Sequence, residues 1–173
     1  MSNSLKIGIS VCAVALSLLL TGCTISYSFT GASIPTQAKT VSIAYFPNNA
    51  PMVAPTLSST LTSALQDKFA RQTKLQIVEE GGDLAFEGEI TGYATAPAAV
   101  TAAETAARNR LTITVRVKYT SLYEPTLNYN KSFQAFAEYD ASTMLQTVED
   151  QLINEIVEQL VEDIFNAAVS NWS

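Results

Sequence analysis

The stretch MLQTVEDQLINEIVEQLVEDIFNAAVSNW, residues 144–172, decides the fold. Its large apolar side chains recur at steps of three, four and one, which is the pattern of an α-helix with a broad apolar stripe. No basic residue follows Lys131, and the polar face of the helix is acidic, with Glu149, Asp150, Glu155, Glu158, Glu162 and Asp163. Anionic lipids would repel such a face, so we expect this helix to pack on the protein's own core.

Two stretches before this helix alternate between apolar and polar residues. Residues 111–119, LTITVRVKY, place their aliphatic side chains on one face and their polar side chains on the other. Residues 84–93, LAFEGEITGY, alternate in the same way, which would place Glu87, Glu89 and Tyr93 together on the polar face. Strands with one buried and one wet face are typical of antiparallel sheets. A fourth main strand is predicted at 127–137, and short strands are predicted at 40–46 and 75–78.

A second amphipathic helix is predicted over Thr56–Gln72, where apolar residues recur at steps of three and four. The elements therefore follow the order strand, helix, strands, helix. Because both helices can bury their stripes on the same face of a sheet, we expect an α+β fold. It would be a two-layer sandwich of two amphipathic helices on one face of a mostly antiparallel four- to five-stranded sheet, formed by residues 40–173 as a single domain.

The first 22 residues have the features of a bacterial lipoprotein signal. Lys6 is followed by an uncharged stretch, Ile7–Leu20, which is too short to span a bilayer comfortably. The next residues, LTGC, resemble a lipobox, in which the cysteine is acylated and becomes the first residue of the mature protein. We therefore expect a signal peptide at 1–22, lipidation at Cys23 and a polar tether over 23–39. A plain secretory signal or an uncleaved anchor helix is the alternative.

Composition excludes several classes of function. Without residues 1–22 the chain keeps 9 of its 10 Lys and Arg against 16 Asp and Glu, a net charge of −7, which argues against nucleic-acid binding. The chain has no histidine, the commonest general base and transition-metal ligand. We therefore expect neither an enzyme nor a metal site, and no cofactor beyond the covalent lipid on Cys23. A glycosidase pair, Glu87 and Glu89, is less favoured than a solvated strand face.

Several segments in order resemble the LptE family of lipopolysaccharide-assembly lipoproteins. They are the lipobox cysteine, YSFTG at 27–31, IPTQAKTVSIAYFPNNAP at 34–51, TLSSTLTSALQDKF at 56–69, GGDLAFEGEITGY at 81–93, LTITVRVKY at 111–119 and VEDQLINEIVEQLVEDIF at 148–165. The aromatic-glycine segment begins at Tyr27 rather than directly after the cysteine. This departure is typical of a divergent branch of the family.

The resemblance implies a non-catalytic subunit of the outer membrane. Members of the family are anchored by their lipid, face the periplasm, bind the β-barrel LptD and help to move lipopolysaccharide to the cell surface. Since this step rests on analogy, a second interpretation stays open. In it, the chain is an adaptor or structural lipoprotein of another envelope complex, with the same fold and no contact with lipopolysaccharide.

A cluster of cations is the candidate lipopolysaccharide site. It consists of Arg108, Arg110, Arg116 and Lys118, whose even numbers place them on one strand face. They could contact the phosphates of lipid A, for which arginine is well shaped. They could equally pair with Glu87 and Glu89 across a hairpin, which is the more ordinary arrangement. The alanine-rich stretch 94–107 at the end of this hairpin is either a surface for close approach or a simple loop.

Overall fold

A computed structural model describes residues 34–52, 54–98 and 107–169. The chain divides into two compact units, 1–30 and 31–173, and all of the first unit lies outside the described residues. The predicted signal peptide, the lipidation site Cys23 and Trp172 therefore lie outside them, as does the tether before Ile34. None of the helices in the described ranges is long and apolar enough to cross a membrane.

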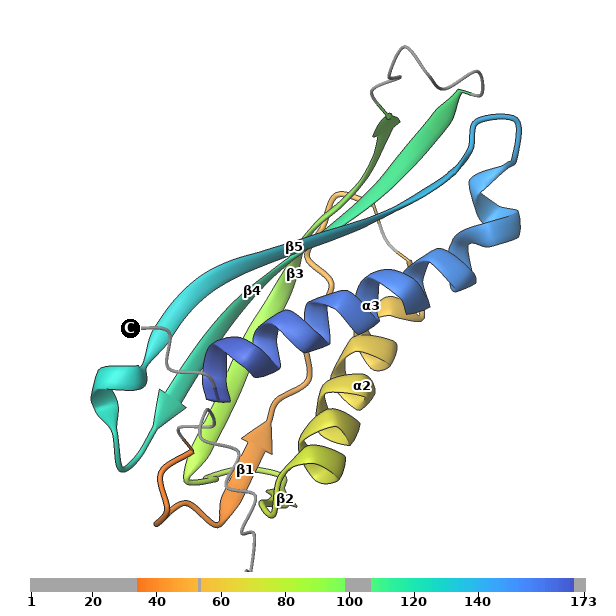
Figure 1. Cartoon of the computed structure of the whole chain (residues 1–173). Helices are drawn as coiled ribbons and strands as arrows, with labels where there is room; N and C mark the ends of the chain where they lie inside the picture. The colour runs from red at the N-terminus through yellow and green to blue at the C-terminus, as the bar shows by residue number, and fades with distance from the viewer. Residues whose placement is uncertain (1–33, 53, 99–106, 170–173) are drawn as a thin grey trace, which may run out of the picture. The chain divides into compact units, whose positions relative to one another are not determined.

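The second unit has the predicted two-layer α+β architecture (Figure 1). Its elements are β1 (Thr40–Ile43), α2 (Leu57–Gln72), β2 (Gln76–Val78), β3 (Leu84–Pro97), β4 (Arg108–Ser121), η1 (Pro125–Leu127), β5 (Tyr129–Asp140) and α3 (Leu145–Val169). The five strands form one sheet in the order β2-β1-β3-β4-β5. Helix α3 contacts β4, β5 and α2, while α2 contacts β1 and β2.

The sheet is mixed rather than purely antiparallel. Strand β1 runs parallel to both of its neighbours, β2 and β3, whereas β3, β4 and β5 form an antiparallel meander. The parallel part arises because α2 separates β1 from β2 and returns the chain to the same end of the sheet. We call the side of the sheet that contacts the helices the core face and the other side the open face.

Aromatic rings join the two layers. The Phe69 ring of α2 lies 4.9 Å from the Phe86 ring of β3 and 5.0 Å from the Phe165 ring of α3, measured between centroids. Phe86 in turn lies 4.9 Å from Tyr119 of β4. Tilted and edge-on aromatic pairs at these distances stabilise a core beyond the area that they bury. The predicted apolar stripes of both helices therefore face a core that the chain builds for itself.

A β-bulge in β3 reverses which face of the sheet the later side chains of this strand lie on. Ile90 pairs with Val115, and Gly92 pairs with Thr114, so Thr91 is an extra residue in the ladder. Tyr93 consequently lies opposite Ile113 on the core face and is 4% exposed. The prediction that Tyr93 shares the polar face with Glu87 and Glu89 was wrong, because regular alternation does not reveal an inserted residue.

Strand β1 is shorter than predicted and ends at Ile43. Beyond it Tyr45 is 62% exposed and Phe46 is fully buried, and the predicted strand does not continue to residue 46. The Phe46 amide donates to the Thr62 hydroxyl of α2 at 3.2 Å. Its ring covers Gly88, where a Cβ atom would lie 2.5 Å from Cε1 of Phe46. Glycine at position 88 is therefore what lets this aromatic side chain pack against β3.

The β3–β4 hairpin is longer than predicted. Residues 94–97 of the alanine-rich stretch belong to β3 and pair with residues 109–112 of β4, while 99–106 lie outside the described residues.

Strand β5 also extends three residues further than predicted, to Asp140. The amide of Gln159 in α3 donates to the Phe136 carbonyl of β5 at 3.3 Å, so α3 covers one backbone group of that strand.

Candidate functional site

The four candidate cations all lie on β4, and the structure places a carboxylate beside each of them. Arg116 lies in register with Glu89 of β3, and its Nη1 is 3.0 Å from Oε1 of that residue. Lys118 lies in register with Glu87, with 2.8 Å between Nζ and Oε2. Glu89 also accepts a hydrogen bond from the Asn49 amide at 2.7 Å. This half of the open face is a ladder of cross-strand ion pairs.

The other two cations share a carboxylate on β5. Glu138 Oε1 accepts hydrogen bonds from Nη2 of Arg110 at 2.6 Å and from Nε at 3.1 Å. Arg108 lies 3.9 Å from the same carboxylate and is in register with Asp140. The guanidinium of Arg110 also stacks 3.9 Å above the Phe136 ring. Arg110 is therefore held from two sides, by two hydrogen bonds to one carboxylate oxygen of Glu138 and by an aromatic face.

The part of the open face that carries the candidate cations has a net charge close to zero, because each cation has a carboxylate beside it. A depression of about 280 Å³ lies over the pairs of Arg116 and Lys118. An anionic ligand there would gain two cations but would also meet Glu87 and Glu89, which already occupy them. Exposed ion pairs of this kind stabilise a protein by only about 0–1 kcal/mol, so a phosphate could compete for the cations. The geometry favours the pairing interpretation and leaves the phosphate contact as a prediction.

The carboxylates Glu87 and Glu89 show no catalytic arrangement. They lie on the same strand face, two residues apart, and each binds a cation of β4. A glycosidase needs two carboxylates on opposite sides of a substrate, with one of them kept protonated. The ion pairs found here keep both groups on the same exposed surface.

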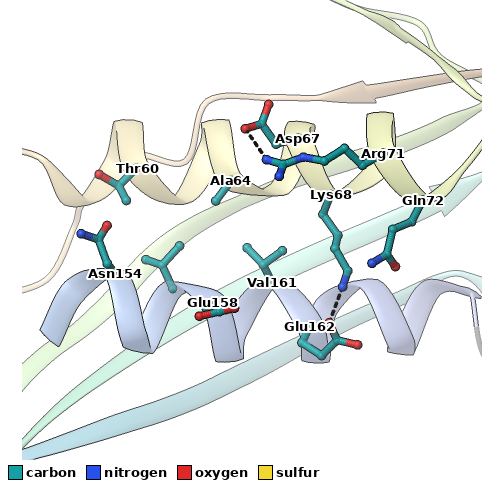
Figure 2. Close-up of a pocket in the computed structure, with 11 residues that line it drawn as sticks. Thr60, Ala64, Asp67, Lys68, Arg71, Gln72, Asn154, Glu158, Val161 and Glu162 are labelled. Atoms are coloured by element: carbon teal, nitrogen blue, oxygen red, sulfur yellow. Dashed lines mark hydrogen bonds and ion pairs between the residues drawn. The ribbon is translucent and has the colours of Figure 1, made fainter. Parts of the chain in front are cut away.

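A second concave surface lies between the two helices on the side away from the sheet. Figure 2 shows this groove of about 370 Å³, which Lys68 and Arg71 of α2 and Glu158 and Glu162 of α3 help to line. Lys68 forms an ion pair with Glu162 across the groove, and its hydrogen bond lowers the pKa of the Glu162 carboxyl. The ion pair between Lys68 and Glu162 therefore connects the two helices across the groove. The side chains that line the groove form no cluster of unpaired charges that would mark a ligand site.

Sequence reasoning missed two polar contacts. The hydroxyl of Tyr93 donates to Glu149 of α3 at 2.5 Å, which links the core face of the hairpin to the acidic helix. Asp83 accepts hydrogen bonds from the amides of Lys39 and Thr40 at 2.8 and 3.0 Å. These bonds lower the pKa of the Asp83 carboxyl. Both contacts join segments far apart in sequence, which residue spacing does not reveal.

Solved structures with a similar arrangement are known, at low identity. A minor lipoprotein from Acinetobacter baumannii is 13% identical, with a TM-score of 0.44 over 73% of this chain and 97% of that chain. Lipoprotein B from Nitrosomonas europaea is 11% identical, with a TM-score of 0.43 over 72% and 80%. A homologue of a neuraminyllactose-binding hemagglutinin from Helicobacter pylori is 10% identical, with a TM-score of 0.48 over 80% and 87%. No curated protein matches the sequence.

The family assignment rests on a different match. The family model described as "LptE: Lipopolysaccharide-assembly" matches residues 38–168, from the residues just before β1 to the last turn of α3. This region contains every strand and both helices of the described domain, and it is well over half of the chain. The resemblance found in the sequence is thereby confirmed: the chain belongs to the LptE family of lipopolysaccharide-assembly proteins.

Proposed function

We propose that this protein is an outer-membrane lipoprotein that binds an LptD-type β-barrel and assists the transport of lipopolysaccharide to the cell surface. The observation that carries the proposal is the family match over the whole folded domain. A domain that builds its own core, and whose candidate cations on β4 are paired, is suited to holding another protein in place rather than to transforming a substrate.

The decisive experiment is co-purification from the native envelope. A tag at the carboxyl end, extracted in mild detergent, should bring down an LptD-type barrel in a fixed ratio. The matched control is a tagged lipoprotein from the same membrane that lacks this fold. Recovery of other envelope proteins without the barrel would contradict the proposal and support the second interpretation, an adaptor of a different complex.

Membrane anchoring is the second part of the proposal, with Cys23 as the acylated residue. The sequence around it supports this, since an uncharged stretch and then LTG precede the expected cleavage point and Cys23 follows it directly. Labelling with a palmitate analogue should mark the wild-type protein and leave Cys23→Ser unlabelled, with Cys12→Ser as the matched control that keeps its label. Separation of the two membranes should place the labelled protein in the outer one, exposed to the periplasm. An unlabelled wild-type protein would overturn this part.

A further inference from the structure

The turn between β4 and β5 exposes two large apolar side chains. Leu122 is 66% exposed and Tyr123 is 45% exposed. The turn itself has a defined conformation, because the Glu124 amide donates to the Ser121 hydroxyl and the Ser121 amide donates to the Asn128 side chain, at 3.2 and 2.7 Å. The two side chains are therefore presented to the surroundings by a fixed backbone.

This turn lies beside the point where the amino-terminal segment joins the sheet. Asp83 connects them, because its carboxylate accepts the amides of Lys39 and Thr40 while its carbonyl accepts the Leu122 amide at 2.9 Å. Figure 1 shows the start of β1 and the β4–β5 connection at the same end of the sheet. The opposite end of β4 pairs with Asp140, just before α3.

The length of the chain before the described domain limits how far this end can be from an anchored Cys23. Ten residues, 24–33, separate Cys23 from Ile34. Even fully extended, they span about 35 Å, since a residue covers at most about 3.6 Å. Strand β4 has 14 residues and is about 46 Å long at 3.3 Å per residue. A lipid on Cys23 would therefore keep the start of the described domain within about 35 Å of the bilayer. The Leu122 end lies on that side of the sheet, while the far end lies a further strand length away.

We propose that Leu122 and Tyr123 form a second membrane contact, inserted into the interfacial region of the phospholipid leaflet that holds the acylated Cys23. The contact rests on the proposed acylation. Tyrosine suits this position because its ring is apolar while its hydroxyl keeps a polar partner, the Asp83 carboxylate. Burial of two side chains is too weak to recruit a protein from solution, but a short tether raises the effective concentration to about the millimolar range.

The charges around the turn define which lipid surface it fits. Asp83 accepts a hydrogen bond from the Leu122 amide, and Glu124 follows Tyr123 directly, so two carboxylates lie at the turn. These carboxylates would be repelled by anionic headgroups, so the contact takes a zwitterionic surface and does not depend on attraction between opposite charges. Added salt should accordingly leave it in place.

A single fluorescent probe tests the contact in the acylated, full-length mature protein. Once residues 1–22 are removed and Cys23 is acylated, no other cysteine remains, so a new cysteine is the only thiol that can be labelled. A polarity-sensitive fluorophore is attached at Glu124→Cys, and the protein is placed in phosphatidylcholine vesicles that contain a nitroxide-labelled lipid. The matched control carries the probe at Met144→Cys, an exposed apolar position (76%) at the far end of the sheet.

The expected result is a blue-shifted probe at position 124, quenched by the nitroxide at least twofold more strongly than the probe at 144. Replacing Leu122 and Tyr123 together with Gln should reduce the quenching at 124 to the level of position 144, whereas Met144→Gln should not change it. Because all these positions are exposed, the fold should survive, and the melting temperature of each variant checks this.

Three outcomes would overturn the inference. If the protein is acylated and bound to vesicles but position 124 is quenched no more than position 144, the membrane contact fails while the proposed function stands. If the blue shift needs an added LptD-type barrel and shows no quenching by lipid, the turn contacts that protein instead. If the protein carries no lipid and does not bind vesicles, both this inference and the proposed anchoring fail.

Discussion

The two faces of strand β4 differ in what they contribute. On the core face Leu111, Ile113, Val115 and Val117 are fully buried against the helix layer. On the open face the alternate residues, such as Arg116 and Lys118, form exposed ion pairs with β3. A single strand thus carries one row of side chains that holds the domain together and one row that is available to the surroundings. Substitutions on the two faces should therefore differ strongly in their effect on stability.

The expected magnitudes follow from the environment of each row. Burial of a Val, Leu or Ile side chain contributes about 1.5–3 kcal/mol, whereas an exposed ion pair contributes about 0–1 kcal/mol. Loss of a core side chain should therefore show in the free energy of unfolding. Loss of an exposed ion pair should change the free energy of unfolding little.

The largest effect is expected where α3 covers the core face. Leu160 is fully buried in the middle of its apolar stripe, so Leu160→Ala should lower the free energy of unfolding by about 2–5 kcal/mol. Glu158→Ala, an exposed position on the same helix, should change it by less than about 0.5 kcal/mol. Denaturant unfolding of the purified variants measures both. Small and equal losses would mean that the stripe faces a partner and not the protein's own core.

Two glycines of β3, one on each face, give a second test of the difference between the faces. A Cβ atom at Gly88 would lie 2.3 Å from the Arg116 carbonyl oxygen and 2.5 Å from the Phe46 ring, so Gly88→Ala should cost about 1–3 kcal/mol. Gly92→Ala meets only the Thr114 side chain at 3.1 Å and should cost clearly less. Thermal and denaturant unfolding give the difference. A cost at Gly92 as large as at Gly88 would contradict the description of the two faces.

A smaller change in the free energy of unfolding is expected for Tyr93, which follows the bulge. Tyr93→Phe keeps the buried ring and removes the hydrogen bond to Glu149, which should lower the free energy of unfolding by about 1–2 kcal/mol at neutral pH. Tyr45→Phe, at an exposed tyrosine, is the control and should have no effect. Denaturant unfolding at pH 7 compares the two variants with the wild type.

The pH dependence gives a second measurement of the same contact. Burial, together with the hydrogen bond to Glu149, raises the pKa of the Tyr93 hydroxyl. Above about pH 10 the unfolded chain loses this proton while the folded protein keeps it, so stability falls as the pH rises. Tyr93→Phe should make this alkaline loss less steep. An identical slope in the wild type and the variant would show that Tyr93 ionises freely in the folded protein.

The smallest effect on stability is expected on the open face. Replacing Arg116 and Lys118 together with Gln should lower the free energy of unfolding by about 1 kcal/mol at most and leave lipopolysaccharide binding unchanged, because these cations already pair with Glu89 and Glu87. Lipopolysaccharide binding and melting are measured on the same preparations. A loss of binding that is specific to charge and weakens with salt would instead support contacts with lipid A phosphates.

Much of the fold could be predicted because it depends on local periodicity. The stripe of α3 and the alternation of β4 place their residues by spacing alone, and both predictions were confirmed. The pairing of strands is less local. Nothing in residues 40–43 indicates that β1 lies between β2 and β3 and runs parallel to both, because that depends on where α2 returns the chain.

The site was harder to predict for the same reason. Even numbering placed Arg116 and Lys118 on one face, and their opposition to Glu87 and Glu89 followed from a simple hairpin. The partner of Arg110 did not follow, since Glu138 is 28 positions away on a strand whose register was unknown. Tyr93 was assigned to the wrong face because one extra residue, Thr91, reverses the alternation without any change in composition.

The bulge at Thr91 also constrains how this hairpin can evolve. Deleting that single residue would restore a regular ladder and turn every later residue of β3 over, moving Tyr93 out to solvent and Ala94 in. Removing or adding two residues together would keep each side chain on its present side. Related sequences should therefore tolerate length changes here in pairs and reject single insertions and deletions, even where the individual substitutions would be harmless.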